Sequence, residues 1–103
     1  MRPVTLRYTQ RARRQLGNIH RYIRERNLEA ATRVIARIRR SANLLRDFPH
    51  LGRHGLVPDT RELSVVGVPY VVVYREKGDE VIEILGVYHT AQDRVADFTP
   101  RDL

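Results

Sequence analysis

The sequence has 103 residues, 42% of them hydrophobic, and no cysteine, which predicts one small globular domain and excludes a disulfide scaffold or a Cys-based zinc module. Residues 1–58 carry 14 arginines against three acidic residues, whereas residues 59–103 carry five basic and nine acidic residues. The basic half is expected to meet a polyanion, either nucleic acid or an acidic protein segment, although any single arginine can equally be a solvated helix-surface residue.

Residues 3–8 alternate between Val4, Leu6 and Tyr8 and more polar positions, the period-two pattern of a half-buried strand. Thr9 can cap a helix. Apolar residues then recur at steps of four, three and four, which marks one helix face: Ala12, Leu16, Ile19 and Ile23. Gly17 lies inside this helix, where it costs roughly 1 kcal/mol relative to alanine.

A second helix is expected to begin after Asn27, a good capping residue, with Glu29 in its first turn. The sequence Phe48-Pro49 ends it, because the residue before proline disfavours helical backbone. Its apolar positions again have helical spacing: Ala31, Val34, Ile35, Ile38, Ala42 and Leu45. The two helices form an antiparallel hairpin whose apolar faces require a sheet to cover them.

Three strands are expected after a loop over residues 49–58, at residues 60–66, 68–75 and 81–88, and their short turns predict an antiparallel meander. The fold class is therefore α+β, in the order β-α-α-β-β-β, with the helical hairpin packed on one face of an antiparallel sheet that the first strand joins. Residues 1–103 form a single domain, with residues 90–103 as a short helix or a loose tail. Neither a signal peptide nor a membrane span is present, so a cytoplasmic protein that does not contact the membrane is expected.

Arginines at strand ends, with Tyr88 and His89, could handle phosphate: guanidinium groups match phosphate geometry, and His89 could act as acid or base. Arg75 is expected near the last hairpin turn and His89 at the far end, so they would meet only through another strand or the loop. In the simpler alternative, His89 is an ordinary strand-end residue and Tyr88 a core aromatic. His50 and His54 have helical ligand spacing in a segment that is not helical, so neither a metal nor a cofactor is expected.

Several segments in order resemble a known family: residues 48–53, 60–63, 69–75 and 84–89, with Arg94 after them. They are similar to the RelE/ParE superfamily of toxins from bacterial type II toxin–antitoxin modules, over nearly the whole chain. The resemblance implies the fold given above. It also implies a small basic toxin, neutralised by an antitoxin whose disordered C-terminal segment folds on the toxin surface. Candidate antitoxin contacts are Leu16, Ile19, Ile23, Arg33, Arg37 and Arg40, the first three of which also suit the core.

Two mechanisms occur in this superfamily. RelE-like members are ribosome-dependent ribonucleases that cut mRNA, and here the residues placed like their functional groups are Arg53, Arg61, Arg75, Tyr88 and His89. ParE-like members, the plasmid-stabilisation type, poison DNA gyrase and perform no chemistry.

The lysines common before the second strand of the nucleases are missing, and three short segments look closer to ParE: Leu51-Gly52-Arg53, Arg61-Glu62-Leu63 and Pro69-Tyr70. The resemblance therefore favours gyrase over the ribosome and mRNA as the target. The nuclease is the alternative, so whether the chain is an enzyme stays open. A non-toxic nucleic-acid-binding domain that uses its basic helices on phosphate is the third possibility.

Overall fold

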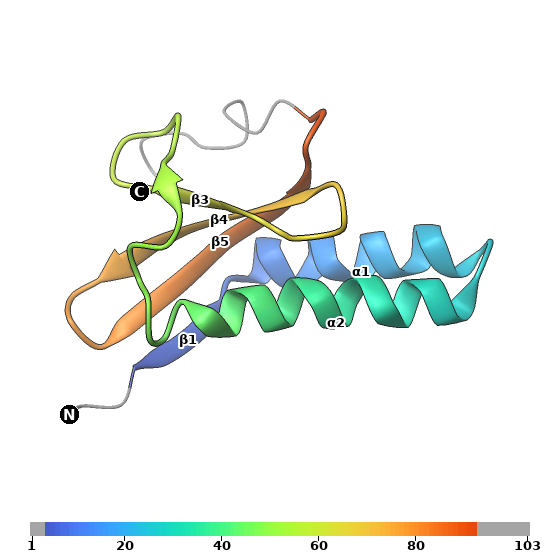
Figure 1. The fold of residues 1–103 in the computed structure, drawn as a ribbon, viewed down its shortest axis with the longest axis horizontal. Coiled ribbons are helices and arrows are strands. Elements are labelled where there is room, and N and C mark those ends of the chain that lie inside the picture. The colour runs from blue at the N-terminus through green and yellow to red at the C-terminus, as the bar shows by residue number, and fades with distance from the viewer. Residues whose placement is uncertain (1–3, 93–103) are drawn as a thin grey trace.

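The computed structural model describes residues 4–92, and it places two helices on one face of a five-stranded sheet (Figure 1). Pro3, which the first strand was expected to include, and residues 93–103 of the expected tail lie outside the described residues. In chain order the elements are β1 (Thr5–Tyr8), α1 (Gln10–Arg24), α2 (Leu28–Leu44), β2 (Arg53–His54), β3 (Arg61–Ser64), β4 (Tyr70–Lys77) and β5 (Val81–His89).

The strand order in the sheet is β1-β5-β4-β3-β2. The predicted meander of β3, β4 and β5 is confirmed, with both neighbouring pairs antiparallel. The sheet as a whole is mixed rather than antiparallel, because β1 pairs in parallel with β5, from Thr5 opposite Val81 to Tyr8 opposite Ile84. Two helices and three strands separate β1 from β5 in the chain, so no tight turn forces this pair to be antiparallel. The expected loop also contains a fifth strand, the two-residue β2, which pairs with β3.

The predicted helix caps are confirmed. The Thr9 hydroxyl accepts a hydrogen bond from the Ala12 amide at 3.1 Å, and the Asn27 side-chain oxygen accepts one from the Ala30 amide at 3.0 Å. Each satisfies an amide that the first turn of a helix leaves without an intrahelical partner. These local interactions fix where both helices begin, so the hairpin follows from short-range sequence alone.

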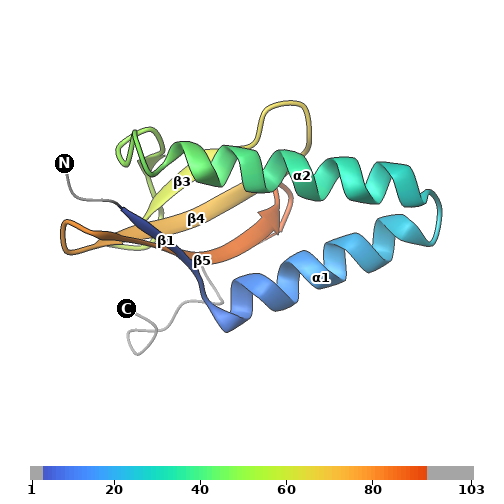
Figure 2. The ribbon, with the colours of Figure 1, turned by 90° about the horizontal axis from the view of Figure 1, so that it is seen from below.

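The helices bury their apolar faces against the sheet, and the two lie side by side across one of its faces (Figure 2). The main core contains Leu16 from α1 and Ile38 from α2, packed on alternate residues of β4 and β5: Tyr70, Val72, Tyr74, Ile82 and Ile84. Burial of these side chains is the main source of stability. The tip of the helical hairpin extends beyond the ends of β4 and β5 in both views (Figures 1 and 2), so its last turns have no strand beneath them.

A second, smaller cluster lies on the other face of the sheet, where the side chains of Val73 from β4 and Leu85 and Tyr88 from β5 pack with Val57 of the loop. The register of β4 and β5 shifts between Val73 and Tyr74, so that Leu85 is an extra residue in β5. Such a bulge re-aims the side chains that follow it. The face opposite the helices is thus partly covered by the segment that connects β2 to β3.

Candidate functional site

The edge pocket is a cavity of about 410 Å³ beside β3 and β4, lined by His54, Asp59, Thr60, Arg61, Arg75 and Glu76. It holds Arg61 and Arg75, two of the five residues that the sequence offered as nuclease groups. It also holds His54, which sequence reasoning left outside that set. The sequence gives little indication that His54 is next to the arginines, because His54 belongs to a two-residue strand that is too short to show a period-two pattern.

One wall of this pocket depends on a buried tyrosine. The Tyr74 hydroxyl donates a hydrogen bond to the Pro49 carbonyl at 2.7 Å and accepts one from the Gly52 amide at 2.9 Å. The Arg61 guanidinium donates to the Gly52 carbonyl at 2.8 Å. A Cβ at position 52 would lie 2.8 Å from the Glu62 carbonyl oxygen and from the Tyr74 ring, so only glycine fits. Arg61 and Tyr74 therefore fix the loop that carries β2.

Arg53 is held by the neighbouring strand. Its guanidinium forms an ion pair with Glu62 at 3.1 Å and donates to the Ser64 hydroxyl at 3.2 Å. The Glu62 side chain is almost fully buried and also accepts a long hydrogen bond from the Leu56 amide, at 3.4 Å. A buried carboxylate needs such partners to remain charged, so Arg53 has a clear structural role in pairing β2 with β3.

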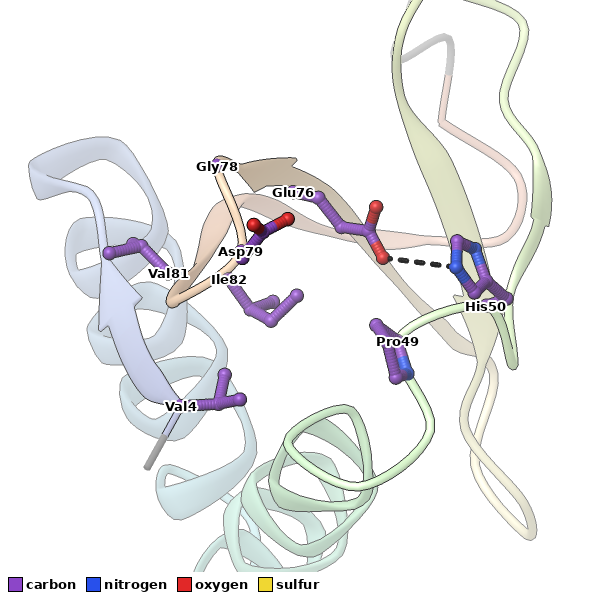
Figure 3. A pocket seen from close by; sticks show the side chains of 8 residues that line it. All are labelled: Val4, Pro49, His50, Glu76, Gly78, Asp79, Val81 and Ile82. Carbon is purple, nitrogen blue, oxygen red and sulfur yellow. Dashed lines mark ion pairs between the residues drawn. The ribbon is translucent and has the colours of Figure 1, made fainter. Parts of the chain in front are cut away.

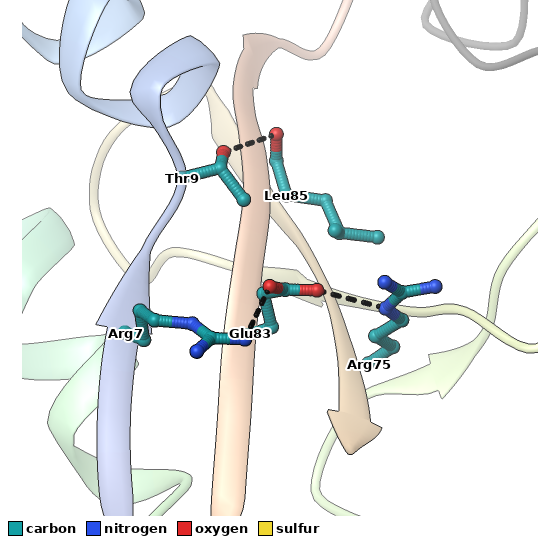
Figure 4. A network of polar contacts seen from close by, with 5 residues as sticks. All are labelled: Arg7, Thr9, Arg75, Glu83 and Leu85. Carbon is teal, nitrogen blue, oxygen red and sulfur yellow. Dashed lines mark hydrogen bonds and ion pairs between the residues drawn. The ribbon is translucent and has the colours of Figure 1, made fainter. Parts of the chain in front are cut away.

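Arg75 is tied to a carboxylate in the same way (Figure 4). Glu83 lies between two arginines and accepts a hydrogen bond from Arg75 at 2.9 Å and one from Arg7 at 2.8 Å. Its side chain is only 10% exposed. Burial by itself raises the pKa of this carboxyl, but the hydrogen bonds and charges of Arg7 and Arg75 outweigh it, so the pKa of Glu83 is lowered. The three side chains join β1, β5 and β4 on the sheet face opposite the helices.

The last two nuclease candidates lie elsewhere. Tyr88 is 1% exposed and belongs to the second core cluster, as in the simpler sequence interpretation. His89 packs edge-to-face on Tyr70 with ring centroids 5.5 Å apart, and its Nδ1 accepts a hydrogen bond from the Ala91 amide at 3.1 Å. Arg75 of β4 pairs with Glu83 of β5. Because Glu83 is six residues before His89 on the same strand, Arg75 and His89 are separated by roughly 20 Å along the sheet. The structure thus does not bring the five candidates together.

The tip groove is an apolar cavity of about 700 Å³ under the hairpin tip, between the helices and the ends of β4 and β5. Its lining includes Ile19, Tyr22, Ile23, Val34, Tyr70 and His89. Tyr22 is 61% exposed, a large apolar surface for a small protein to leave in water. The groove has the shape and chemistry to accept an apolar segment of another chain, and its one imidazole is that of His89.

The six predicted antitoxin contacts separate into four environments. Ile19 and Ile23 line the tip groove, whereas Leu16 is buried in the core and cannot touch a partner. Arg37 donates a hydrogen bond to the Val66 carbonyl at 3.2 Å and so fastens α2 to the turn between β3 and β4. The remaining two, Arg33 and Arg40, are exposed on the side of α2 away from the sheet.

A third cavity, of about 240 Å³, lies between the start of β1, the β4–β5 turn and the loop after α2 (Figure 3). Across it the His50 Nε2 approaches the Glu76 carboxylate at 3.4 Å, an ion pair when the imidazole is protonated. The His50 side chain is mostly exposed, so this pair contributes little to stability. His50 and His54 line different cavities and do not form a common site.

Neither described helix is both long and apolar enough to cross a membrane. A family model described as the ParE toxin of the type II toxin–antitoxin system parDE matches residues 6–94. The chain is 41% identical over 87 residues to a protein of Sinorhizobium fredii named Putative toxin Y4kP, which covers 84% of this chain and 88% of that protein.

Two solved structures share the fold. One is described as the chromosomal ParDE TA system from P. aeruginosa and matches with a TM-score of 0.75 and 26% identity, over 84% of this chain and 95% of that one. The other is the toxin–antitoxin complex RelBE2 from Mycobacterium tuberculosis, with a TM-score of 0.62 and 24% identity, over 84% of this chain and 98% of that one. The second match is a likeness of fold.

Proposed function

This chain belongs to the ParE family of type II toxin–antitoxin toxins, and from this membership we propose that it acts by poisoning DNA gyrase. The observation that carries the proposal is that Arg75 of β4 and His89 of β5 lie towards opposite ends of the β4–β5 hairpin. A ribonuclease that used His89 as its proton-transfer group would need this imidazole beside Arg75, where the transition state is stabilised. Arg53 and Arg75 are each paired with a buried carboxylate instead. A poison that acts by binding needs no such assembly.

The proposal is tested by tightly repressed expression in a bacterial host, with labelled thymidine, uridine and amino acid followed over the first minutes after induction. Gyrase poisoning predicts early loss of thymidine incorporation and filamentous cells. An immediate stop in amino-acid incorporation, with DNA synthesis continuing, would contradict it. A host that carries a gyrase variant selected for resistance to this chain supplies the matched control.

The edge pocket supports one alternative, a ribosome-dependent mRNA endoribonuclease. His54 lines the same cavity as Arg61 and Arg75, so an imidazole and two guanidinium groups border one space. In such an enzyme His54 would move the proton and the arginines would hold the scissile phosphate. The variants His54→Gln and Arg75→Ala separate the two mechanisms: both abolish toxicity if the chain is this nuclease, and His54→Gln leaves it intact if the chain is a gyrase poison.

We further propose that the tip groove receives the C-terminal segment of the cognate antitoxin. An apolar groove beneath two helices fits the apolar face of a helix, and the formal net charge of +7 favours an acidic segment. Ile19 and Ile23, which the sequence suggested as contacts, line this groove together with Tyr22.

The variants Tyr22→Ala and Ile23→Asp test this docking. Each is expected to weaken antitoxin binding by tenfold or more, the loss of about 1.4 kcal/mol or more that accompanies removal of a central anchor. The control is Val66→Asp, because Val66 is 80% exposed and does not line the tip groove. Isothermal titration calorimetry with the antitoxin measures all three. Equal affinity of Ile23→Asp and wild type would exclude the groove as the docking site.

A further inference from the structure

Four arginines share the outer surface of the helical hairpin, the side away from the sheet. Arg14 and Arg21 lie on α1 and Arg33 and Arg40 on α2, and all four are exposed. Each of them is two residues away from a residue that faces the core; for example, Arg14 is two residues from the buried Leu16, and Arg40 is two residues from the buried Ile38. Two residues turn an α-helix by about 200°, so the arginines are on the side of each helix opposite the core. We call these four side chains the outer arginine face.

The outer arginine face consists of two rows, one on each helix. The arginines of each helix are seven residues apart, which is two turns and about 10.5 Å along the axis. The helices are antiparallel and joined by three residues between Arg24 and Leu28, so Arg21 and Arg33 lie nearer the tip and Arg14 and Arg40 lie farther from it. The two helices are closest at the tip and diverge towards the start of α1 (Figure 2), so the two rows of arginines spread apart in the same direction.

These charges have no neutralising partner within the chain described. Among residues 4–92, none of the four guanidinium groups forms an ion pair; Arg21 contacts only the Asn18 side chain, at 3.3 Å. The hairpin carries two acidic residues, Glu25 and Glu29, both at its tip. Four uncompensated guanidinium groups give this surface a positive potential. A partner of opposite charge would neutralise it.

A glycine on this surface gives an independent indication of a partner. Gly17 lies in the middle of α1, between Arg14 and Arg21, and it is exposed. A Cβ at this position would meet nothing within 4 Å, so packing does not demand glycine, and glycine in a helix interior is roughly 1 kcal/mol less stable than alanine. Ala36 occupies the corresponding place between Arg33 and Arg40 and is also exposed. Small residues between the arginines of each row allow a ligand to come close to the helix backbones.

From this arrangement we propose that the outer arginine face binds the phosphate backbone of duplex DNA, independently of sequence. A guanidinium group donates two parallel hydrogen bonds to a phosphate, and two rows of exposed guanidinium groups on one surface can contact phosphates of both strands of a duplex. The large exposed apolar side chains of the helices, Tyr22, Leu28 and Leu44, lie near helix ends rather than between the rows, so this face offers a peptide no central anchor. The site lies on the opposite side of the hairpin from the sheet, and it does not depend on the gyrase mechanism.

The test is fluorescence anisotropy with a labelled 20-base-pair DNA duplex of mixed sequence, at several salt concentrations between 50 and 200 mM. Four phosphate contacts predict a slope of log K against log salt of about −3.6, a loss of about a hundredfold in affinity over this range. The double variants Arg14→Gln/Arg21→Gln and Arg33→Gln/Arg40→Gln are each expected to reduce the slope to about −1.8. Circular dichroism confirms that each variant is folded.

The matched control is Arg46→Gln/Lys77→Gln, which removes the same charge from exposed positions outside the outer arginine face. It is expected to leave the slope near that of wild type. A control slope that falls as far as those of the double variants would show diffuse attraction to net charge and overturn the proposal. So would absence of duplex binding at 50 mM salt, or tighter binding of an RNA duplex or of a 20-residue polyglutamate. Each double variant is also assayed for toxicity on expression, so that failure of DNA binding and failure of the gyrase proposal are scored separately.

Discussion

The loop that forms the edge pocket should depend on a single phenol oxygen. Tyr74 is fully buried, and its hydroxyl bonds to Pro49 and Gly52 at 2.7 and 2.9 Å. The substitution Tyr74→Phe keeps the ring and removes both hydrogen bonds. The Gly52 amide is buried with its residue, whereas Pro49 is partly exposed and its carbonyl can bind water. The main loss is therefore one unsatisfied buried donor, worth about 1–3 kcal/mol.

We expect Tyr74→Phe to lower the free energy of unfolding by about 2 kcal/mol, which for a domain of this size lowers Tm by roughly 8–16 °C. Urea unfolding followed by circular dichroism measures the first quantity, and the slope with urea should be unchanged because the buried surface is the same. Hydrogen exchange at the Gly55 amide, which bonds to the Thr60 carbonyl at 2.8 Å, should accelerate as the loop loosens.

The control is Tyr22→Phe, which removes a hydroxyl from a mostly exposed tyrosine and should change the free energy of unfolding by less than about 0.5 kcal/mol. The reasoning fails if Tyr74→Phe is as stable as this control. It also fails if Tyr74→Phe loses stability without faster exchange at Gly55, because the loss would then lie elsewhere in the core.

Three further substitutions follow from the structure. Gly17→Ala meets no neighbouring atom and should raise the free energy of unfolding by about 0.8–1 kcal/mol; a less stable variant in thermal unfolding would show that the glycine has a structural role. Gly67→Ala should destabilise by 1 kcal/mol or more, since Gly67 has φ of +83° and lies against the Arg37 side chain; unchanged urea unfolding would count against that contact. The pKa of Glu83 is lowered in the folded protein. Its ion pairs therefore contribute fully to the free energy of unfolding above the pKa of a free glutamate, about 4.3, and this contribution is lost as the pH falls through the pKa of the folded protein. The stability difference between wild type and Glu83→Gln should therefore be constant from pH 7 to about 5.5 and shrink in stronger acid; a difference that does not vary with pH would contradict the assignment.

The helical hairpin could be predicted from sequence because its determinants are local. Thr9 and Asn27 cap the helices within three residues of where their side chains act, and the apolar spacing sets the buried faces without knowledge of the sheet. The meander could likewise be predicted, since short turns leave β4 and β5 no choice but to run antiparallel. The separation of Arg75 from His89 follows from that hairpin register.

Other features depend on contacts far along the chain. The parallel pairing of β1 with β5 joins segments more than 70 residues apart, and no local pattern encodes its direction. Arg37 looks like a free member of a basic stripe in sequence, but the turn at Val66 gives it a backbone partner 29 residues away. His54 reaches Arg61 and Arg75 only because the loop forms β2. Site residues that come from loops are for this reason harder to predict than core residues.

The central claim is that this toxin acts on gyrase by binding, and it is tested most directly with purified components. Supercoiled plasmid, DNA gyrase and ATP are incubated with the protein, and the DNA is separated after detergent and protease treatment. The account predicts linear DNA that accumulates with protein concentration, in equal amounts for wild type and His54→Gln, and that disappears when antitoxin is added first. Unchanged gyrase products, together with cleavage of mRNA on programmed ribosomes that His54→Gln abolishes, would contradict it.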